Sequence, residues 1–428
     1  LSQNTTFEFE NFWSIFEIQD VYTLNYLPEY IGEINYEVEA YKVTYLTKNE
    51  DDSLVNASGV IYKPVNSSCV SPILSWQHGT IVADFSAPSQ KINNNIIGLV
   101  AASHGYVVVM SDYLGLGEGY GFHNYCHSDT ESSAVINLIL ETIEFISPQN
   151  FNGQLFLMGY SQGGHATMAA VKEIESNFTD VINITASCPM AGPYSMSSAQ
   201  AEMLNEVYPN PGYFPYVIFS YQNVYGNLYE NSSQLFKAGF ENLLEMYDGT
   251  YSMSEINDEI WSIAENVYGI SQSDFSPLDM INNNYYQDYL SDEEHPFKLA
   301  LKDNDLVDFT PDSPMRLIHC NGDDNVPYEN SLLAFNYFSQ FTSEELVLLD
   351  GGNFNHSDCA QPSIIAAKLF FDQLVEFCNN TSINTVSQNK YIVKYYDIYG
   401  RVINKYNESS NLFIKLYSDG TLEKSITF

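Results

Sequence analysis

The feature that most constrains the fold is a sharp turn, Gly159-Tyr160-Ser161-Gln162-Gly163. It matches the G-x-S-x-G pattern, in which small flanking residues let a strand turn abruptly into a helix and hold the serine hydroxyl above a sheet edge. An apolar strand is predicted over 154–158 and a helix over 163–174, so the pattern has the context it needs. A Gly-rich turn with an ordinary capping serine is the alternative. A serine hydroxyl becomes a nucleophile only when a base takes its proton, so a histidine must reach Ser161.

Strand-like and helix-like patterns alternate from about residue 30 to 195. An antiparallel strand pair is predicted first, around a polar turn at 49–52, and short buried strands and an amphipathic helix follow it. The ranges are 34–46 and 59–62 for the pair, 72–77 and 106–111 for the buried strands, and 128–146 for the helix. This alternation predicts an α/β fold with a mostly parallel central sheet and helices on both faces.

The alternation stops after Ala191-Gly192-Pro193 and resumes near residue 313. The segment between, 195–312, is rich in aromatic residues, has helix-like stretches and lacks a buried strand. Because it is too long for a loop, it predicts a helical cap. We expect strands at 315–320 and 345–349 and helices at 330–341 and 363–377 thereafter, and then a polar linker and a small C-terminal β-unit with strands at 391–398 and 412–417. The expected division is therefore 1–194 and 313–380 for the core, 195–312 for the cap and 381–428 for the tail.

Chain order selects the base, because the acid and then the base follow the nucleophile in folds with this turn. His356 is the only histidine after residue 319 and follows a predicted strand in a Gly-rich loop. Three other histidines follow Ser161, but their positions are less suitable. His165 lies in the helix after the turn, His295 lies in the cap, and His319 lies within a strand, where a packed core role is expected.

The acid is expected on the loop after the strand 315–320, in Asn321-Gly322-Asp323-Asp324-Asn325-Val326-Pro327. Asp323 has the D-x-x-V spacing and is preferred, with Asp324 as the alternative. The acid would hold the imidazole of the base in the correct tautomer and stabilise the imidazolium. The alternative is that Asp323 is an ordinary exposed residue of the turn.

The oxyanion that forms during acyl transfer must be met by hydrogen-bond donors. The N–H of Gln162 is one candidate, at the start of the helix after the turn. The second is expected from Gln77-His78-Gly79-Thr80, where we favour the Thr80 N–H. His78 precedes the nucleophile and is expected to structure its loop.

The net charge of the chain limits the kinds of molecule that we expect it to bind. Lys and Arg number 16 against 54 Asp and Glu, a formal net charge of −38. Such a surface repels phosphate backbones and anionic lipids, so nucleic-acid binding is not expected. No stretch approaches the roughly eighteen continuous apolar residues of a membrane span. Because the chain begins with Leu1, we expect a mature form whose signal peptide is out of view.

Six cysteines are spread singly, without a C-x-x-C pair, which argues against a structural zinc site. An even count allows up to three disulfides in an exported protein, with six buried free thiols as the alternative.

With these residues in place, the chain resembles the secretory lipase family of α/β-hydrolases, in its bacterial branch. The resemblance spans about 30–380 and rests on five blocks: Ser75-Trp76-Gln77-His78-Gly79-Thr80, Ser111-Asp112-Tyr113-Leu114-Gly115-Leu116-Gly117, Gly159-Tyr160-Ser161-Gln162-Gly163-Gly164-His165, Gly322-Asp323-Asp324-Asn325-Val326-Pro327 and His356-Ser357-Asp358-Cys359. It implies a Ser-Asp-His triad, a helical cap and hydrolysis of acylglycerols or simpler esters. Cys320 and Cys359 flank the acid and base loops, so a bridge between them is a hypothesis.

The tail, 391–428, resembles the C-terminal sorting domain of Bacteroidetes type IX secretion. The matching parts are Tyr396-Asp397-Ile398-Tyr399-Gly400-Arg401-Val402 and Tyr417-Ser418-Asp419-Gly420-Thr421, whereas Asn411-Leu412-Phe413 replaces the usual Gly-x-Tyr. The resemblance implies export past the outer membrane.

These observations predict a secreted or cell-surface serine esterase or lipase that acts through Ser161, Asp323 and His356 on a small-molecule or lipid ester, without metal or organic cofactor. Two alternatives stay open: a secreted serine peptidase, and a catalytically inactive hydrolase fold that serves as a binding protein. The cap shows no β-propeller repeats and no basic cluster for a peptide carboxylate, which disfavours the peptidase.

Overall fold

The computed structural model describes residues 35–65, 70–342 and 344–377 in full. It also describes the backbone of five further strands, β1 (Thr6–Trp13), β10 (Ile392–Tyr396), β11 (Val402–Ile403), β12 (Leu412–Tyr417) and β13 (Leu422–Ile426). Within these residues no helix has both the length and the apolar character to span a bilayer.

Nine strands form the main sheet in the order β1-β2-β3-β5-β4-β6-β7-β8-β9. β1, β2 and β3 make the antiparallel edge, and the other six run parallel. Their bounds are Val38–Lys48 (β2), Leu54–Pro64 (β3), Ser71–Gln77 (β4), Val107–Ser111 (β5), Phe151–Tyr160 (β6), Ile184–Met190 (β7), Met315–His319 (β8) and Leu346–Asp350 (β9). The predicted mostly parallel sheet is therefore confirmed.

Strand β7 was missed by the sequence patterns. Its sequence, ITASCPM, contains small residues and Pro189 rather than a continuous apolar run, yet most of it is buried. It pairs in parallel with β6 and β8, and so places the end of β6 inside the sheet rather than at an edge.

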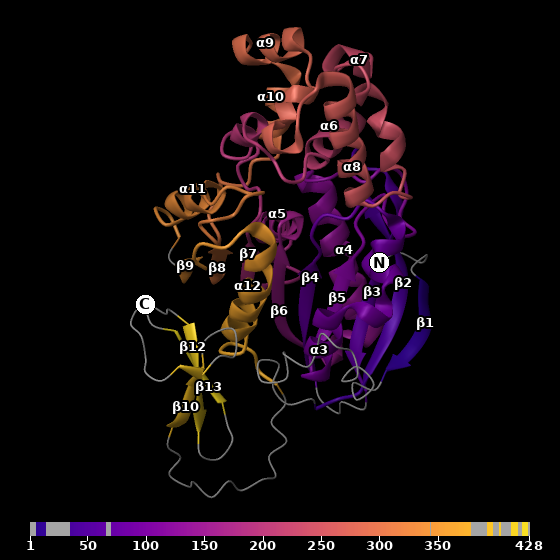
Figure 1. Ribbon diagram of the computed structural model, residues 1–428. Coiled ribbons are helices and arrows are strands. Elements are labelled where there is room, and N and C mark those ends of the chain that lie inside the picture. The colour runs from indigo at the N-terminus through magenta and orange to yellow at the C-terminus, as the bar shows by residue number, and fades with distance from the viewer. Residues whose placement is uncertain are drawn as a thin grey trace, which may run out of the picture.

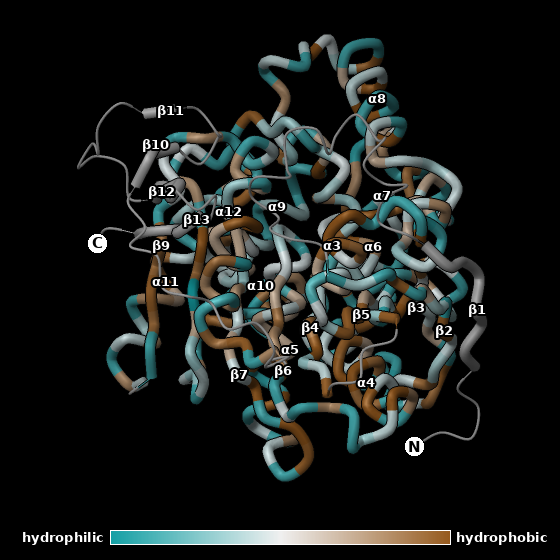
Figure 2. The backbone as a smooth tube through the Cα atoms, turned by 90° about the horizontal axis from the view of Figure 1, so that it is seen from below, coloured by the Kyte–Doolittle hydropathy of each residue, from teal (hydrophilic) through white to brown (hydrophobic). Residues whose placement is uncertain are grey.

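Helices cover both faces of the sheet (Figure 1). α3 (Ile96–Ser103) and α12 (His356–Phe371) pack on one face, where Leu99 and Phe370 join a core of strand residues. α4 (Ser128–Ile146) and α5 (Gln162–Asn177) pack on the other, and α11 (Glu329–Phe338) packs with α5. Figure 2 shows the strands and helices of this region, β5 and α4 among them, in hydrophobic colours.

The segment 195–312 is helical and lies at one end of the sheet in Figure 1. Its α-helices are α6 (Tyr213–Tyr225), α7 (Ser232–Leu235), α8 (Met253–Ile263), α9 (Asn283–Ser291) and α10 (Pro296–Asp303), with 3₁₀ segments between several of them. They share a core of aromatic and aliphatic side chains. The ring of Tyr216 on α6 stacks on Tyr125 at 4.6 Å, which joins this layer to the sheet domain.

Helix α12 begins earlier than predicted. The sequence predicts a helix from residue 363, with His356 in a loop, whereas the structure makes His356 its first residue. Asn355 explains the difference, because its side chain accepts a hydrogen bond from the Asp358 N–H (2.8 Å) and caps the helix. His356 is thus held by a helix end rather than by a free loop.

The tail strands form a separate antiparallel sheet in the order β11-β10-β12-β13. β10 and β12 lie within the two strands predicted for the tail. The side chains that carry the sorting-domain resemblance lie outside the fully described residues.

Candidate active site

Ser161 lies at the junction of β6 and α5 with φ 62° and ψ −124°, a conformation that non-glycine residues rarely adopt. Hydrogen bonds hold it there, since its N–H donates to Met190 O at 3.0 Å. The turn requires small neighbours. A Cβ on Gly163 would lie 2.1 Å from Gln77 O, and one on Gly159 would lie 2.2 Å from Gly163 O. The sequence therefore makes a strained turn that presents one serine at the carboxyl end of β6.

The acid candidate on the loop after β8 meets the base candidate at the first residue of α12. His356 Nδ1 lies 2.6 Å from Asp323 Oδ2, and the Asp323 side chain is fully buried. Asp324 instead accepts a hydrogen bond from the His356 backbone N–H at 3.1 Å. Of the two adjacent carboxylates, Asp323 is therefore the one that contacts the imidazole, and Asp324 anchors the first turn of α12.

Tyr160 brings His356 next to the turn. Its hydroxyl donates to His356 O at 2.7 Å, and the two rings lie 4.9 Å apart. The Ser161 hydroxyl forms no hydrogen bond with any fully described residue. The structure thus places Ser161, His356 and Asp323 in one region, with Tyr160 as a link that sequence patterns did not reveal.

A disulfide joins the same two loops. Cys320, at the end of β8, bonds Cys359 in the first turn of α12, with an S–S distance of 2.03 Å and a Cα–Cα distance of 6.0 Å. Cys126 and Cys188 are free and buried, so neither the maximum of three disulfides nor the alternative of six free thiols applies. Burial raises the pKa of both thiols, which keeps them protonated. Cys69 and Cys378 lie outside the described residues.

A pocket opens at Ser161 and Gln162. Its other lining residues are mostly apolar and come from the loop at 125–126, from segment 193–301 and from Val326, and they include Met196, Leu204, Phe214, Val217, Phe297 and Leu301. Burial raises the pKa of the Tyr125 and Tyr208 hydroxyls well above the ordinary value, so the wall carries no charge. The pocket suits an uncharged, largely apolar group.

The two candidate oxyanion donors belong to segments that lie next to Ser161. Gln162 is the first residue of α5, so its N–H has no partner within the helix. A Cβ on Gly79 would lie 3.8 Å from Ser161 Cβ, which puts the loop with Thr80 beside the turn. The Thr80 hydroxyl pairs with Tyr125 OH at 2.9 Å. His78 contacts Gly79 O and Asp112 O through its two ring nitrogens, as a residue that holds this loop would.

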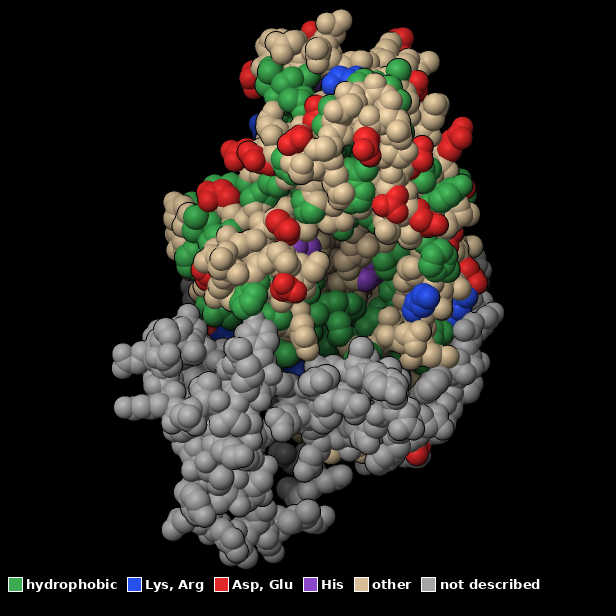
Figure 3. Space-filling view, in the orientation of Figure 1, with side chains coloured by type: hydrophobic (Ala, Val, Ile, Leu, Met, Phe, Trp, Pro, Cys, Tyr) green, Lys and Arg blue, Asp and Glu red, His purple; other side chains and the backbone are tan. Residues whose placement is uncertain are grey.

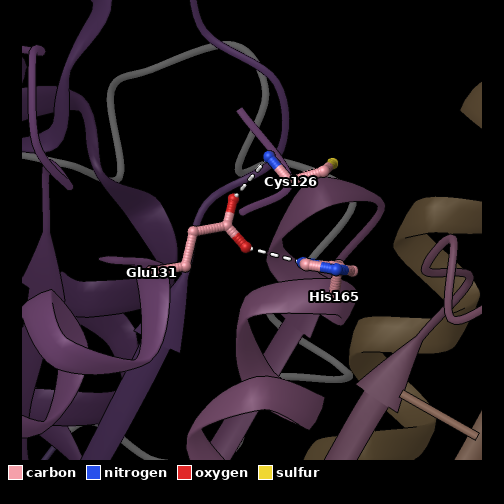
Figure 4. Close-up of side chains that lie close together, drawn as sticks. All are labelled: Cys126, Glu131 and His165. Carbon is pink, nitrogen blue, oxygen red and sulfur yellow. Dashed lines mark hydrogen bonds and ion pairs between the residues drawn. The ribbon is translucent and has the colours of Figure 1, made fainter. Parts of the chain in front are cut away.

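Behind the turn lies a buried polar network that no sequence pattern predicts (Figure 4). Glu131 on α4 accepts hydrogen bonds from the Gln162 amide (2.8 Å), the Cys126 N–H (3.1 Å) and His165 Nδ1 (2.7 Å). Gln162 also contacts His123 Nε2 at 2.7 Å. Burial lowers the pKa of His123 to about 4, so this ring is neutral and its Nε2 accepts from the amide. The network ties the turn to the loop that lines the pocket.

Cys126, Glu131 and His165 are also the one group among the described residues whose ligand atoms lie close enough to hold a metal ion. Both Glu131 oxygens are already occupied by hydrogen bonds, and in Figure 4 the thiol points away from the carboxylate. The arrangement therefore fits a hydrogen-bonded anchor better than a metal centre.

Comparison with known proteins agrees with this architecture. A Legionella pneumophila protein shares 23% identity over 89% of this chain and 99% of its own, with a TM-score of 0.76. The rice cell wall degrading esterase LipA of Xanthomonas oryzae shares 26% identity over 86% of this chain and 98% of its own, with a TM-score of 0.74. Lipase A of Candida antarctica in its closed state shares 17% identity over 80% and 79%, with a TM-score of 0.61.

These likenesses confirm the predicted α/β-hydrolase fold with its mostly parallel sheet. No curated protein sequence matches the chain significantly. The family model described as secretory lipase matches residues 83–357, a span that runs from the loop after β4 to the first turn of α12 and includes Ser161, Asp323 and His356. Because this match covers well over half of the 428 residues, the chain belongs to the secretory lipase family.

Proposed function

We propose that this chain hydrolyses carboxylic esters, with Ser161 as nucleophile, His356 as general base and Asp323 as the acid that orients the base. The observation that carries the proposal is the strained conformation of Ser161, φ 62°, at the mouth of an apolar pocket. The 2.6 Å contact between His356 Nδ1 and Asp323 supports it, because that contact leaves Nε2 as the nitrogen available to a hydroxyl.

The proposed reaction is a two-step acyl transfer. His356 Nε2 takes the Ser161 proton as Oγ attacks the ester carbonyl, and the tetrahedral intermediate collapses when His356 protonates the departing alcohol. Water, deprotonated by the same nitrogen, then attacks the acyl-serine, releases the acid and restores the hydroxyl. Asp323 stays ionised throughout and stabilises the imidazolium.

The oxyanion would be held by the N–H groups of Gln162 and Thr80. Gln162 is well placed for this role because it is the first residue of α5, where the helix dipole also favours negative charge. One donor of this kind is worth about 3 kcal/mol of transition-state stabilisation.

We infer that the substrate places an uncharged acyl group in the pocket above Ser161. The wall is apolar and its tyrosines are neutral, so a charged group would lose its hydration without a partner. The net charge of −38 also opposes anionic substrates, and Figure 3 shows acidic side chains scattered over the visible face with few basic ones.

We further propose that the protein is exported, with 1–194 and 313–380 as the hydrolase core, 195–312 as its cap and 381–428 as a sorting-type tail. The family is a secretory one, and the Cys320–Cys359 disulfide suits an oxidising compartment. Fractionation of the producing cells, with an antibody against the core, tests this: protein confined to the cytoplasm with both thiols free would contradict export.

The decisive test of the chemistry is covalent labelling. A fluorophosphonate probe should modify Ser161 stoichiometrically, as peptide mass spectrometry would show, and Ser161→Ala should abolish both labelling and turnover of p-nitrophenyl esters of graded chain length. Ser195→Ala is a matched control, because Ser195 is a buried serine whose N–H is bonded to Asn330 outside the site. Wild-type turnover in Ser161→Ala would refute the mechanism. Peptide hydrolysis without ester hydrolysis would favour the peptidase alternative, and a correctly folded protein that neither labels nor turns over would favour the binding protein.

A further inference from the structure

A second histidine lies behind the acid. His319 is the last residue of β8, four residues before Asp323, and its side chain is fully buried. Its Nε2 lies 2.9 Å from Val326 O and 3.3 Å from Asp323 Oδ2, and its Nδ1 lies 2.8 Å from Ser331 Oγ. Because the carbonyl of Val326 can only accept, Nε2 carries a hydrogen, and this N–H lies beside the Asp323 carboxylate. In the neutral ring, Nδ1 accepts the Ser331 hydroxyl proton.

The Asp323 carboxylate is consequently held at both oxygens. Oδ1 accepts from the N–H groups of Asn325 (2.9 Å) and Val326 (2.8 Å), whereas Oδ2 lies 2.6 Å from His356 Nδ1 and 3.3 Å from His319 Nε2. Burial by itself would raise the pKa of Asp323, but hydrogen bonds from His319 and His356 outweigh it and hold that pKa well below its ordinary value. Both histidines therefore contact the same oxygen of Asp323, Oδ2.

We propose that His319 is a positioning residue that fixes the orientation of Asp323 and limits the basicity of the oxygen facing His356. The inference rests on the proposed function, in which Asp323 orients the general base. A donor on Oδ2 spreads the negative charge of the carboxylate. It therefore weakens the pull of Asp323 on the His356 imidazolium and keeps the base ready to release its proton to the leaving group.

The environment of His356 makes this effect measurable. In the described structure two titratable groups besides Asp323 contact His356. Asp324 accepts a hydrogen bond from the His356 backbone N–H, and Tyr160 contacts the His356 ring and carbonyl oxygen. Neither touches Nδ1. A change in the surroundings of Asp323 should therefore move the acid limb of the pH–kcat/KM profile, which reports the ionisation of the catalytic base in the free enzyme.

The competing interpretation is that His319 only packs β8 against α11. Its bonds to Val326 O and Ser331 would satisfy both ring nitrogens, and its ring also lies 5.5 Å from that of Tyr328. A packing role predicts that substitutions lower stability without moving the pH profile.

A matched pair of variants separates these interpretations. The amide of glutamine reaches about as far as imidazole Nε2, whereas that of asparagine reaches only as far as Nδ1, so His319→Gln can keep the bond to Asp323 and His319→Asn cannot. With p-nitrophenyl butyrate as the probe, we expect His319→Asn to lower kcat/KM about tenfold. We also expect it to move the acid limb upward by about half a pH unit. His319→Gln should stay within about threefold of wild type with an unmoved limb.

Ser331→Ala is the control, because it removes the partner of Nδ1 without touching Asp323. It should leave the acid limb in place and lower only the stability. Equal losses in His319→Asn and His319→Gln, or an acid limb that stays fixed in both, would overturn the inference. The proposed function would fail differently, since wild-type protein would then not label with fluorophosphonate at all.

A measurement on the unaltered protein covers the case in which His319→Asn does not fold. Nitrogen-15 NMR of histidine-labelled protein should show His319 as the neutral Nε2–H tautomer. The signal should shift when fluorophosphonate modifies Ser161, because the charge of His356 then changes on the other side of Asp323. A His319 signal that does not respond would show that the ring is not coupled to the site.

Discussion

The Cys320–Cys359 disulfide ties the loop that carries Asp323 to the helix that begins with His356. The two cysteines are 39 residues apart in sequence. In the chain-entropy model, closing a loop of that length removes about 13 cal/mol/K from the unfolded chain, or about 4 kcal/mol at 25 °C. We therefore expect the double variant Cys320→Ala/Cys359→Ala to lose about 4 kcal/mol of unfolding free energy, a large share of the 5–15 kcal/mol typical of proteins.

The same variant should keep most of its activity at 25 °C. Hydrogen bonds also join the two loops, from Asn321 N–H to Gly352 O (3.0 Å), from Gly351 N–H to His319 O (2.8 Å) and from His356 N–H to Asp324 (3.1 Å). Because these bonds persist in the folded state, the geometry at His356 does not depend on the disulfide alone. We expect kcat/KM within about threefold of wild type while the protein is folded.

Urea unfolding followed by tryptophan fluorescence measures the first quantity, and ester hydrolysis at 25 °C measures the second. Cys188→Ala is the matched control, because it removes a buried sulfur that forms no bridge and should cost only about 1 kcal/mol. A double variant no less stable than this control would refute the loop-entropy reasoning. A folded double variant that has lost its activity would show that the bridge itself sets the geometry.

Three further outcomes are expected. Asp323→Asn should lower kcat about 10³- to 10⁴-fold, because it allows the wrong imidazole tautomer of His356. Asp324→Asn should lower kcat less than about tenfold. Steady-state kinetics that reverse this order would identify Asp324 as the acid. Glu131→Leu leaves the buried donors of Gln162, Cys126 and His165 without an acceptor, so we expect it to lower the free energy of unfolding in urea by about 3–5 kcal/mol. Glu131→Gln should lower it less. A leucine variant as stable as wild type would contradict the role of Glu131 as a hydrogen-bonded anchor. Burial raises the pKa of Asp112 from 3.8 to about 6, so the folded protein binds a proton at Asp112 more tightly than the unfolded chain does. The resulting stabilisation of the folded state is fully present below about pH 4 and is lost as the pH rises through 6. The free energy of unfolding should fall by roughly 3 kcal/mol over this range. Asp112→Asn should remove this component from the pH dependence of unfolding free energy, and parallel wild-type and variant curves between pH 4 and 7 would contradict it.

The sequence predicts the parts of this molecule that local backbone chemistry determines. Gly159 and Gly163 allow the turn at Ser161 because neither position has room for a Cβ, and the alternation of apolar runs predicts the parallel sheet around it. Strand β7 was missed because its burial comes from small residues between two neighbouring strands rather than from an apolar run. The start of α12 was misplaced because one capping side chain, Asn355, decides it.

Polar partnerships in the core follow a different rule, because each joins segments far apart in the chain. Gln162 and His165 follow Ser161 on a helix packed against the sheet, so their polar atoms had to find buried partners, and that demand is visible in the sequence. The identity of the partner, Glu131, depends on how α4 packs on α5, so it is not visible in the sequence. Cysteine pairing obeys the same limit: Cys320 reaches Cys359 because β8 and α12 converge, whereas Cys126 and Cys188 are buried without a neighbouring thiol. A sequence thus tells where a buried polar group needs a partner before it tells which residue provides it, and in this protein those partners are the residues that hold Gln162 and Asp323 in place.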